Sequence, residues 1–333
     1  FIKASVKRQD AQLVITWEGE ALGAVAVYMS EDPDFVESEA TLLANVDGNE
    51  YAVEVSKAVR VYFILKAENG ARIRVAERVI TMDSLTNFRD LGGYLTEDGK
   101  RTKWGKLLRS AAHDSITDDD VALLQKMGLK TVIDYRTTPE VMDHADREVE
   151  GVTYRRISPM ENPNATNTLD VNQSKSMKSA EDAIAMLTGI NKMLAGDAYC
   201  NSVYREVMNV VMDPAQVPFI QHCTSGKDRT GVTGGLMLYA LGADMETING
   251  YSVINVHPWS ISIENLSYFV SQLDEDVQRG AGGVLEGVAH GVAHDGGLVA
   301  VGALATVVAG LDVLLGVVPG AAGIGHEHGH GET

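Results

Sequence analysis

The sequence predicts two domains of different fold class, a β-sandwich followed by an α/β domain. Up to about residue 82, apolar and polar residues alternate between turn signals and show no helical period. Beyond that point helical and strand patterns alternate, as in an α/β domain. The length of 333 residues also exceeds one typical domain. We therefore expect a sandwich at 1–82, an α/β domain at 83–279 and a tail of different composition at 280–333.

The first region contains strand patterns separated by short turn signals, two of which are Asp47-Gly48 and Asn69-Gly70. Several short strands without a helix favour a small immunoglobulin-like β-sandwich. The region contains no cluster of catalytic residue types. The expected strands are residues 12–17, 23–29, 40–46, 58–67 and 71–80.

The second region begins with loops and a hairpin at 85–111, whose turn falls at Glu97-Asp98-Gly99. Residues 115–128 then have an N-cap candidate followed by apolar residues three and four apart, which predicts a helix. We expect a buried strand at 130–136, two helices within 180–212, a strand at 217–223 and a helix over 230–243. The polar segment 161–178 is interpreted as a surface loop, with a lid over a site as the alternative.

The tail from Gly280 lacks Lys and Arg and is rich in Gly, Ala and Val. Its apolar stretch is long enough to span a bilayer, but Asp312 and the glycines within it, and the lack of a basic flank, favour a buried or poorly ordered tail. The composition also allows a foreign or frame-altered sequence. Histidines at 326, 328 and 330 suggest adventitious metal binding, because no carboxylate or thiol set completes a site.

Composition limits the function classes. The formal net charge of −18 opposes long-range attraction to nucleic acid or to an anionic membrane, so an anionic ligand needs a local site. Only two cysteines, Cys200 and Cys223, are present, which excludes a disulfide framework and leaves room for a catalytic thiol. Because the sequence starts at Phe1 without Met, an upstream segment is expected to have been cleaved or omitted, and the compartment stays open between cytoplasmic and secreted.

The segment 222–231 reads HCTSGKDRTG and lies where a predicted strand becomes a helix. A short loop that closes onto a helix N-terminus directs successive backbone N–H groups into one concavity, and the helix dipole adds positive potential there. Such a concavity suits a tetrahedral dianion. The sequence therefore predicts a phosphate site formed by Thr224, Ser225, Gly226, Lys227, Asp228, Arg229 and Thr230.

Two side chains of this loop predict covalent chemistry on the phosphate. Arg229 can hold two phosphoryl oxygens in a planar fork, while the N–H groups and Arg229 favour the nucleophilic thiolate form of Cys223. Gly226 permits the turn, and the Thr230 hydroxyl is expected to reach the sulfur and help it depart when the phospho-cysteine is hydrolysed. We expect His222 to brace the loop through its ring nitrogens rather than to act as a base.

Departure of the substrate oxygen requires a proton, and two acids qualify. Asp228 lies inside the loop, and Asp134 ends the predicted strand 130–136. The residues themselves do not decide between them. Lys227 adds a second cation beside the phosphate pocket, which favours substrates with more than one phosphate, such as phosphoinositides.

Two other interpretations of the loop are weaker. Cys223 could be a buried core thiol beside a solvated helix start, as isolated cysteines often are. Against this, the preceding strand, the glycine in the loop, the arginine at its fixed spacing from the cysteine and the apolar helix that follows all favour a phosphate site. A Walker-type phosphate loop is excluded because Lys227 is followed by Asp228 instead of Ser or Thr.

The segment HCTSGKDRTG resembles the phosphate-binding signature of the cysteine-dependent protein tyrosine phosphatase superfamily, in the form typical of its bacterial tyrosine/dual-specificity and lipid phosphatase branch. Upstream, NFRDLGGYLTEDGKRTKWGKLLRSA and TVIDYRTTPEV are similar to two further blocks of that branch. The similarity covers roughly residues 84–255. Three ordered blocks make chance agreement improbable.

The resemblance implies roles for individual residues. Cys223 would be the nucleophile and Arg229 the phosphate clamp, with the main-chain N–H groups of 224–229 completing the anion site. Within this branch Asp228 would be the general acid and Asp134 would lie close to the site. Lys227 is associated in the branch with activity on phosphoinositides. No cofactor or metal is implied.

The leading hypothesis is thus a protein tyrosine phosphatase that acts on phosphotyrosine, with phosphoserine, phosphothreonine and phosphoinositides as further substrates. Its partner is a phosphorylated protein or phosphoinositide, without nucleic acid and without clear membrane insertion, and its oligomeric state is left open. The alternatives are a catalytically impaired phosphate-binding and docking module and an inositol polyphosphate phosphatase.

Overall fold

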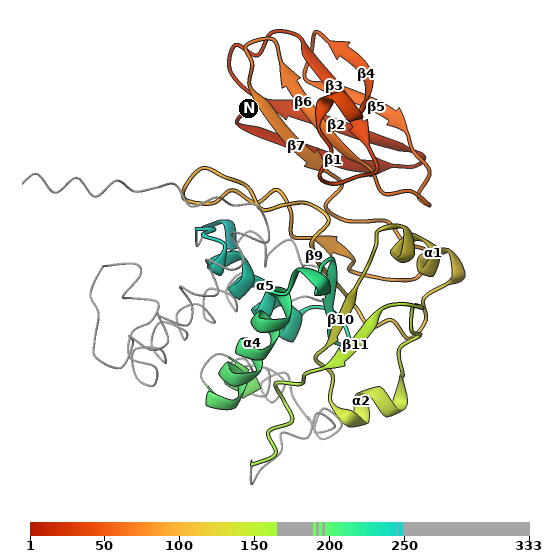
Figure 1. Ribbon diagram of the computed structural model, residues 1–333, viewed down its shortest axis with the longest axis vertical. Coiled ribbons are helices and arrows are strands. Elements are labelled where there is room, and N and C mark those ends of the chain that lie inside the picture. Colours follow the sequence, from red (N-terminus) through yellow and green to blue (C-terminus); the bar gives the residue numbers. More distant parts are fainter. Residues whose placement is uncertain (165–188, 191–192, 195–196, 245, 249–333) are drawn as a thin grey trace, which may run out of the picture.

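The computed structural model describes residues 1–164, 189–190, 193–194, 197–244 and 246–248 (Figure 1). The predicted tail with its histidines, most of the predicted insertion at 161–178 and the first of the two helices expected within 180–212 lie wholly or largely outside these residues. Among the described residues, no helix has the length and apolar character needed to cross a bilayer.

The N-terminal region is a sandwich of two antiparallel sheets (Figure 1). One sheet has the strand order β1-β2-β5 and the other β4-β3-β6-β7. Inward residues such as Ile15, Val27 and Leu65 are fully buried between the sheets. The strands are β1 (Lys3–Gln9), β2 (Gln12–Glu18), β3 (Val25–Ser30), β4 (Thr41–Val46), β5 (Glu50–Glu54), β6 (Tyr62–Ala67) and β7 (Arg72–Ala76), with a 3-10 turn η1 (Glu37–Glu39) before β4.

All five predicted strands of this region are confirmed, and two strands were missed by the sequence patterns. The missed β1 buries only Val6 fully, and β5 buries none of its side chains fully, because both lie at the edges of their sheet. A strand with so few buried residues gives a weak alternation signal. The domain boundary after residue 82 and the immunoglobulin-like class of the sandwich stay predictions.

The C-terminal region is built on a five-stranded sheet in the order β11-β10-β12-β9-β8. Four of these strands, β9, β12, β10 and β11, are parallel to one another, and the fifth described strand, β8, pairs antiparallel with β9. The strands are β8 (Arg89–Asp90), β9 (Leu107–Ser110), β10 (Thr131–Asp134), β11 (Thr153–Arg156) and β12 (Phe219–His222). The predicted α/β architecture is confirmed.

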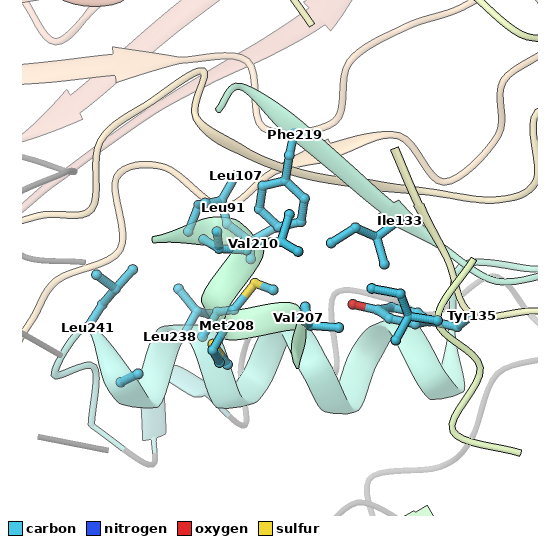
Figure 2. Packing of buried hydrophobic residues seen from close by; sticks show 14 of the residues in the cluster. Leu91, Leu107, Ile133, Tyr135, Val207, Met208, Val210, Phe219, Leu238 and Leu241 are labelled. Carbon is cyan, nitrogen blue, oxygen red and sulfur yellow. The ribbon is translucent and has the colours of Figure 1, made fainter. Parts of the chain in front are cut away.

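Helices cover both faces of this sheet. Alternate strand residues point to opposite faces. Ile133 and Phe219 therefore pack with α4 and α5 in one core (Figure 2), while Val132 and Ile220 pack with α1 in another. The helices are α1 (Asp118–Lys126), α2 (Thr138–Asp143), α4 (Ala198–Val211) and α5 (Asp228–Ala240), with a 3-10 turn η3 (Pro214–Gln216) before β12.

The sequence patterns placed most of these elements correctly. Helices α1 and α5, strands β10 and β12 and the hairpin turn at Glu97-Asp98-Gly99 agree with the predictions. Strand β9 lies instead within the segment 85–111, which was interpreted as loops and a hairpin. Its four residues are all buried, including Arg109 and Ser110, and two polar residues in so short a run hide the pattern of a buried strand.

The two regions share a close interface. Trp104, from the hairpin region of the α/β part, belongs to the buried core of the sandwich, and its Nε1 donates to the carbonyl oxygen of Arg74 at 3.2 Å. Arg60 and Asp90 form a buried ion pair across the same boundary at 3.1 Å. Because both a tryptophan and an ion pair are buried there, the sandwich holds the hairpin that precedes β9.

Candidate active site

The predicted phosphate loop lies between the end of β12 and the start of α5, as the sequence predicts. The backbone at Gly226 has φ of +64°, and a Cβ atom there would lie 2.0 Å from the carbonyl oxygen of Ser110. Only glycine fits such a position, because it combines a left-handed conformation with contact against another strand's backbone. Gly226 thus fixes the curvature of the loop.

The loop leaves its main-chain donors unused. Within the described part of the chain, the N–H groups of Thr224, Ser225, Gly226 and Lys227 donate no hydrogen bond. They lie directly before the N-terminus of α5, where the helix dipole is positive. Unpaired N–H groups at a helix N-terminus form an anion-binding site.

Cys223 lies at the base of this loop and is buried, with a free thiol. Thr230, on the first turn of α5, is fully buried, and its hydroxyl makes no hydrogen bond in the described part of the structure. The predicted bond from Thr230 to the sulfur is therefore not formed in this state. The hydroxyl stays available for it because no other group among the described residues occupies it.

Arg229 is buried and is held by a carboxylate that the sequence analysis did not select. Its Nη1 and Nη2 donate to the two oxygens of Glu140 at 2.8 and 2.7 Å, and Nη1 also donates to the carbonyl oxygen of Tyr135 at 3.1 Å. Burial alone would lower the pKa of Arg229, but Glu140 raises it above its ordinary value. Glu140 also accepts from the Thr224 hydroxyl at 2.6 Å, so one carboxylate orients both the clamp and the loop.

Asp228 begins α5 beside the loop and differs chemically from the other acids of the site. Burial raises the pKa of Asp228 against the opposing effect of Lys227 and Arg229. One of its carboxylate oxygens is buried without a hydrogen-bond partner in the described residues, and the other lies 3.8 Å from Lys227 Nζ. A carboxyl group with a raised pKa can carry a proton for transfer.

Asp134, the second acid candidate, is part of a buried ionic network. Arg136 donates to both of its carboxylate oxygens at 2.9 to 3.1 Å and also lies 2.8 Å from Asp146. Asp146 in turn lies 3.2 Å from Nε2 of His222. Both carboxylate oxygens of Asp134 are thus occupied by Arg136, which gives this side chain a structural place in the network.

His222 is completely buried at the end of β12. Its Nδ1 lies 3.2 Å from the carbonyl oxygen of Cys223, and its ring stacks on His113 with centroids 4.8 Å apart. Burial lowers the pKa of His113 to about 3. The structure thus places His222 behind the loop, where the sequence analysis assigned it a bracing role.

Asp134, Asp146 and His222 are also the residues with metal-ligand chemistry that lie within reach of one another in the described part of the chain. Both carboxylates already pair with Arg136. Since oxygens of both carboxylates are already occupied by the guanidinium, the residues do not fit a resident cation, and no metal is assigned.

Two residues that the sequence analysis did not select hold the loop from outside. Asn87 donates from Nδ2 to the carbonyl oxygens of Ser225 and Gly226 at 3.0 and 2.9 Å. Arg109, buried on β9, donates to the same carbonyl of Gly226 and to that of Lys227. Both residues lie in the segment 87–111, the first of the two upstream blocks described in the sequence analysis. The similarity of that block was the sequence signal that could have identified them.

A strand, a loop with free N–H groups, a buried cysteine and a clamping arginine define the class of cysteine-based phosphate sites. The sequence model of the tyrosine phosphatase family matches residues 80–257, which is more than half of the chain. This chain belongs to the tyrosine phosphatase family.

Three curated relatives agree with this assignment. A protein of Cupriavidus necator, provisionally named a tyrosine-protein phosphatase, is 30% identical over 51% of this chain and 60% of its own length. A tyrosine-protein phosphatase of Nostoc commune is 29% identical over 53% of this chain and 54% of its own length. The triple specificity protein phosphatase PtpB of Mycobacterium tuberculosis is 27% identical over 49% and 63%.

The chain thus spans between 54% and 63% of the length of these relatives. Among solved structures, the core catalytic domain of the PP-IP phosphatase Siw14 from S. cerevisiae gives a TM-score of 0.30 at 15% identity and covers 52% of this chain and 84% of its own. A likeness this weak carries no argument about substrate.

Proposed function

We propose that this protein is a tyrosine phosphatase that hydrolyses phosphotyrosine through a phospho-cysteine at Cys223. The observation that carries the proposal is the loop after β12, which brings a buried thiol, four unused N–H donors and Arg229 to one point. Family membership supports the same chemistry. Thr224, Ser225, Gly226, Lys227, Asp228, Arg229 and Thr230 form the proposed phosphate-binding set.

The first step transfers the phosphoryl group to sulfur. The phosphate enters the loop, where N–H groups and the guanidinium of Arg229 hold its oxygens. The Cys223 thiolate attacks phosphorus, a P–S bond forms and the ester P–O bond breaks. The leaving oxygen takes its proton from Asp228, the acid whose pKa is raised.

The second step hydrolyses the intermediate. Water attacks the phosphorus of phospho-Cys223 and passes a proton to the Asp228 carboxylate, while the P–S bond breaks and inorganic phosphate leaves. The sulfur leaves as the thiolate, and the Thr230 hydroxyl donates a hydrogen bond to it, a contact for which this hydroxyl is free among the described residues. Asp134 and His222 hold the loop and transfer no proton.

The geometry around Arg229 fits bidentate capture of phosphate. Glu140 accepts from Nη1 and Nη2, and Nη2 also donates to the Thr224 hydroxyl oxygen at the long distance of 3.5 Å. Nε makes no hydrogen bond in the described part of the chain, so the edge formed by Nε and Nη2 can take two phosphoryl oxygens when one of them replaces the long Thr224 contact. An arginine with its far edge fixed loses little freedom when it binds the anion.

A second substrate class, phosphoinositides, is favoured by Lys227. Its ammonium lies beside the loop and pairs with Asp228 at 3.8 Å, a weak contact that a second phosphate group can replace. The name of the relative PtpB, a triple specificity protein phosphatase, supports more than one substrate class. Phosphoserine and phosphothreonine are proposed as further substrates.

The N-terminal sandwich is proposed to be immunoglobulin-like and to hold the hairpin before β9 in place. Support comes from its two-sheet topology and from Trp104, which is buried in its core. This role is structural, since the sandwich contributes none of the loop's side chains.

Phosphate release from a phosphotyrosine peptide, measured with EDTA present, tests the proposal. We expect turnover in the native chain and none in folded Cys223→Ser. Cys200→Ser is the matched control, because Cys200 is the other buried free thiol and burial raises its pKa to about 12. Turnover that survives in Cys223→Ser contradicts the mechanism, and phosphopeptide binding without turnover in the native chain supports the docking module instead.

A further inference from the structure

A cavity of about 730 Å³ lies between the sandwich and the hairpin of the α/β region. It is lined from the sandwich by the loop at Pro33 and by β7, and from the α/β region by residues 95–104. Its volume is within the range typical of small-ligand sites. It is separate from the phosphate loop, since none of the loop's residues lines it.

The charge of this cavity is opposite to that of the chain. Arg72, Arg74, Arg101 and Lys103 line it, against the single carboxylate of Asp34. The whole chain carries a formal net charge of −18. A local cluster of cations in so acidic a protein attracts small anions that the rest of the surface repels.

Two of these cations have no carboxylate partner among the described residues. Arg101 donates from Nη1 to the carbonyl oxygen of Gly93 at 3.0 Å, and Arg74 donates to the carbonyl oxygens of Pro33 and Phe35. Burial lowers the pKa of both arginines, and the neighbouring Arg78 lowers that of Arg101 further. Asp34 and Asp32 offset this effect for Arg74, whereas no carboxylate does so for Arg101, so Arg101 gains most from a bound anion.

The remaining contacts favour phosphoryl groups. Lys103 lies 3.7 Å from Asp34 and remains partly exposed, so its ammonium can turn towards a ligand. Arginines bind phosphoryl oxygens in planar forks, and Lys adds a point charge. Trp104, Ile73 and Leu95 give the cavity apolar walls beside the charges.

We propose that this cavity is a second binding site, for a small ligand that carries at least two phosphoryl groups. The ligand bridges the two regions, since Arg74 lies on β7 and Arg101 and Lys103 lie on the hairpin. The phosphoryl groups belong either to a free anion or to a lipid headgroup, which present the same chemistry to these cations.

Calorimetric titration of the full chain with inorganic pyrophosphate tests this site. The variants are Arg101→Gln/Lys103→Gln, the charge-matched control Lys7→Gln/Lys130→Gln, and Arg229→Gln to remove the phosphate loop's contribution. We expect binding in Arg229→Gln to persist, and at least about tenfold weaker binding when the cavity cations are also replaced. The cavity variant should keep the phosphatase activity of the native chain.

The cavity and control variants are compared in the Arg229→Gln background. Equal pyrophosphate affinity of the two in that background, or no pyrophosphate binding by Arg229→Gln itself, overturns the proposal. If the double variant does not fold, Lys103→Gln alone serves, since that side chain is 38% exposed. Cosedimentation with phosphoinositide vesicles identifies the source: capture that is lost in the cavity variant assigns a lipid headgroup, and pyrophosphate binding without capture assigns a free anion.

Discussion

The carboxylate of Glu140 grips the guanidinium of Arg229 end-on, with both oxygens within 2.8 Å of its Nη1 and Nη2 atoms. Glu140 lies on α2 and Arg229 on α5, so the contact joins two elements that are 89 positions apart. The contact leaves Nε without a hydrogen bond in the described part of the chain. Glu140 is therefore a positioning residue for the clamp.

Glu140→Gln should reduce kcat/KM for phosphotyrosine peptides by about ten- to hundredfold, because hydrogen bonds to a charged group are lost. Burial alone would raise the pKa of Glu140, but Arg229 holds it far below its ordinary value, so the carboxylate is ionised at every pH at which the enzyme is assayed. The loss should show in the inhibition constant of vanadate as well as in KM.

The control for this change is Glu161→Gln, which removes a carboxylate that bonds the N–H of Thr138 on the same helix and does not contact Arg229. Equal kinetics for Glu140→Gln and the native chain would remove the positioning role.

Asp228→Asn should lower kcat about 10²- to 10⁴-fold on phenyl phosphate and far less on p-nitrophenyl phosphate, since the nitrophenolate needs no proton to leave. Burial raises the pKa of Asp228, so the native enzyme loses its acid as pH rises through that value. The variant should lack this decline. Asp134→Asn is the control, because a structural role of Asp134 predicts similar losses of kcat on both substrates. A larger loss on phenyl phosphate than on p-nitrophenyl phosphate in Asp134→Asn would instead make Asp134 the general acid and Asp228 the structural residue.

Asp146→Asn should lower the free energy of unfolding by about 3 kcal/mol in urea at neutral pH, because it removes a carboxylate from buried Arg136 and His222. Burial alone would raise the pKa of Asp146, yet His222 and Arg136 bring it to about 2.

This depressed pKa gives the change a pH signature. The stabilisation is complete above the unfolded-state pKa of about 3.9 and is lost as pH falls towards 2. The native chain should therefore lose stability across that window, and the variant should lose less. Asp118→Asn, whose side chain is 92% exposed, is the control and should leave the profile unchanged. Identical acid profiles for Asp146→Asn and the native chain would show that the network does not contribute.

Asn87→Gly should lower kcat about tenfold with little loss of stability, since it keeps the backbone at φ +55° and removes two bonds to the loop carbonyls. Asn87→Ala should add a cost of about 1 to 2 kcal/mol from the left-handed backbone. Asp10→Gly, at φ +53° in the sandwich, controls for the backbone effect alone. Full activity in folded Asn87→Gly would show that the loop holds its shape without this brace.

The phosphate loop could be predicted from sequence because everything it needs is contiguous. The strand ending at His222, the glycine with positive φ and the helix from Asp228 follow one another within a few residues, so local rules suffice. The same holds for α1 and β10, each of which has a complete local pattern.

The supporting residues could not be predicted in this way because they reach the site from other segments. Glu140 lies on α2, Asn87 and Arg109 lie in the hairpin region, and Asp146 lies in the segment after α2. Only the strand order β10-β12-β9 brings them together. The Arg136 fork on Asp134 is local, but the Asp146 and His222 contacts that complete this network join separate segments, so the sequence alone did not separate the roles of Asp134 and Asp228.

The most direct test of the proposed chemistry is acid quenching of the enzyme during turnover of a phosphotyrosine peptide, followed by mass spectrometry of the digested protein. The mechanism predicts a phosphoryl group on the peptide that contains Cys223, present in the native chain and absent in Cys223→Ser. Turnover that leaves phosphate on another residue, or on none at any quench time, would contradict a phospho-cysteine mechanism.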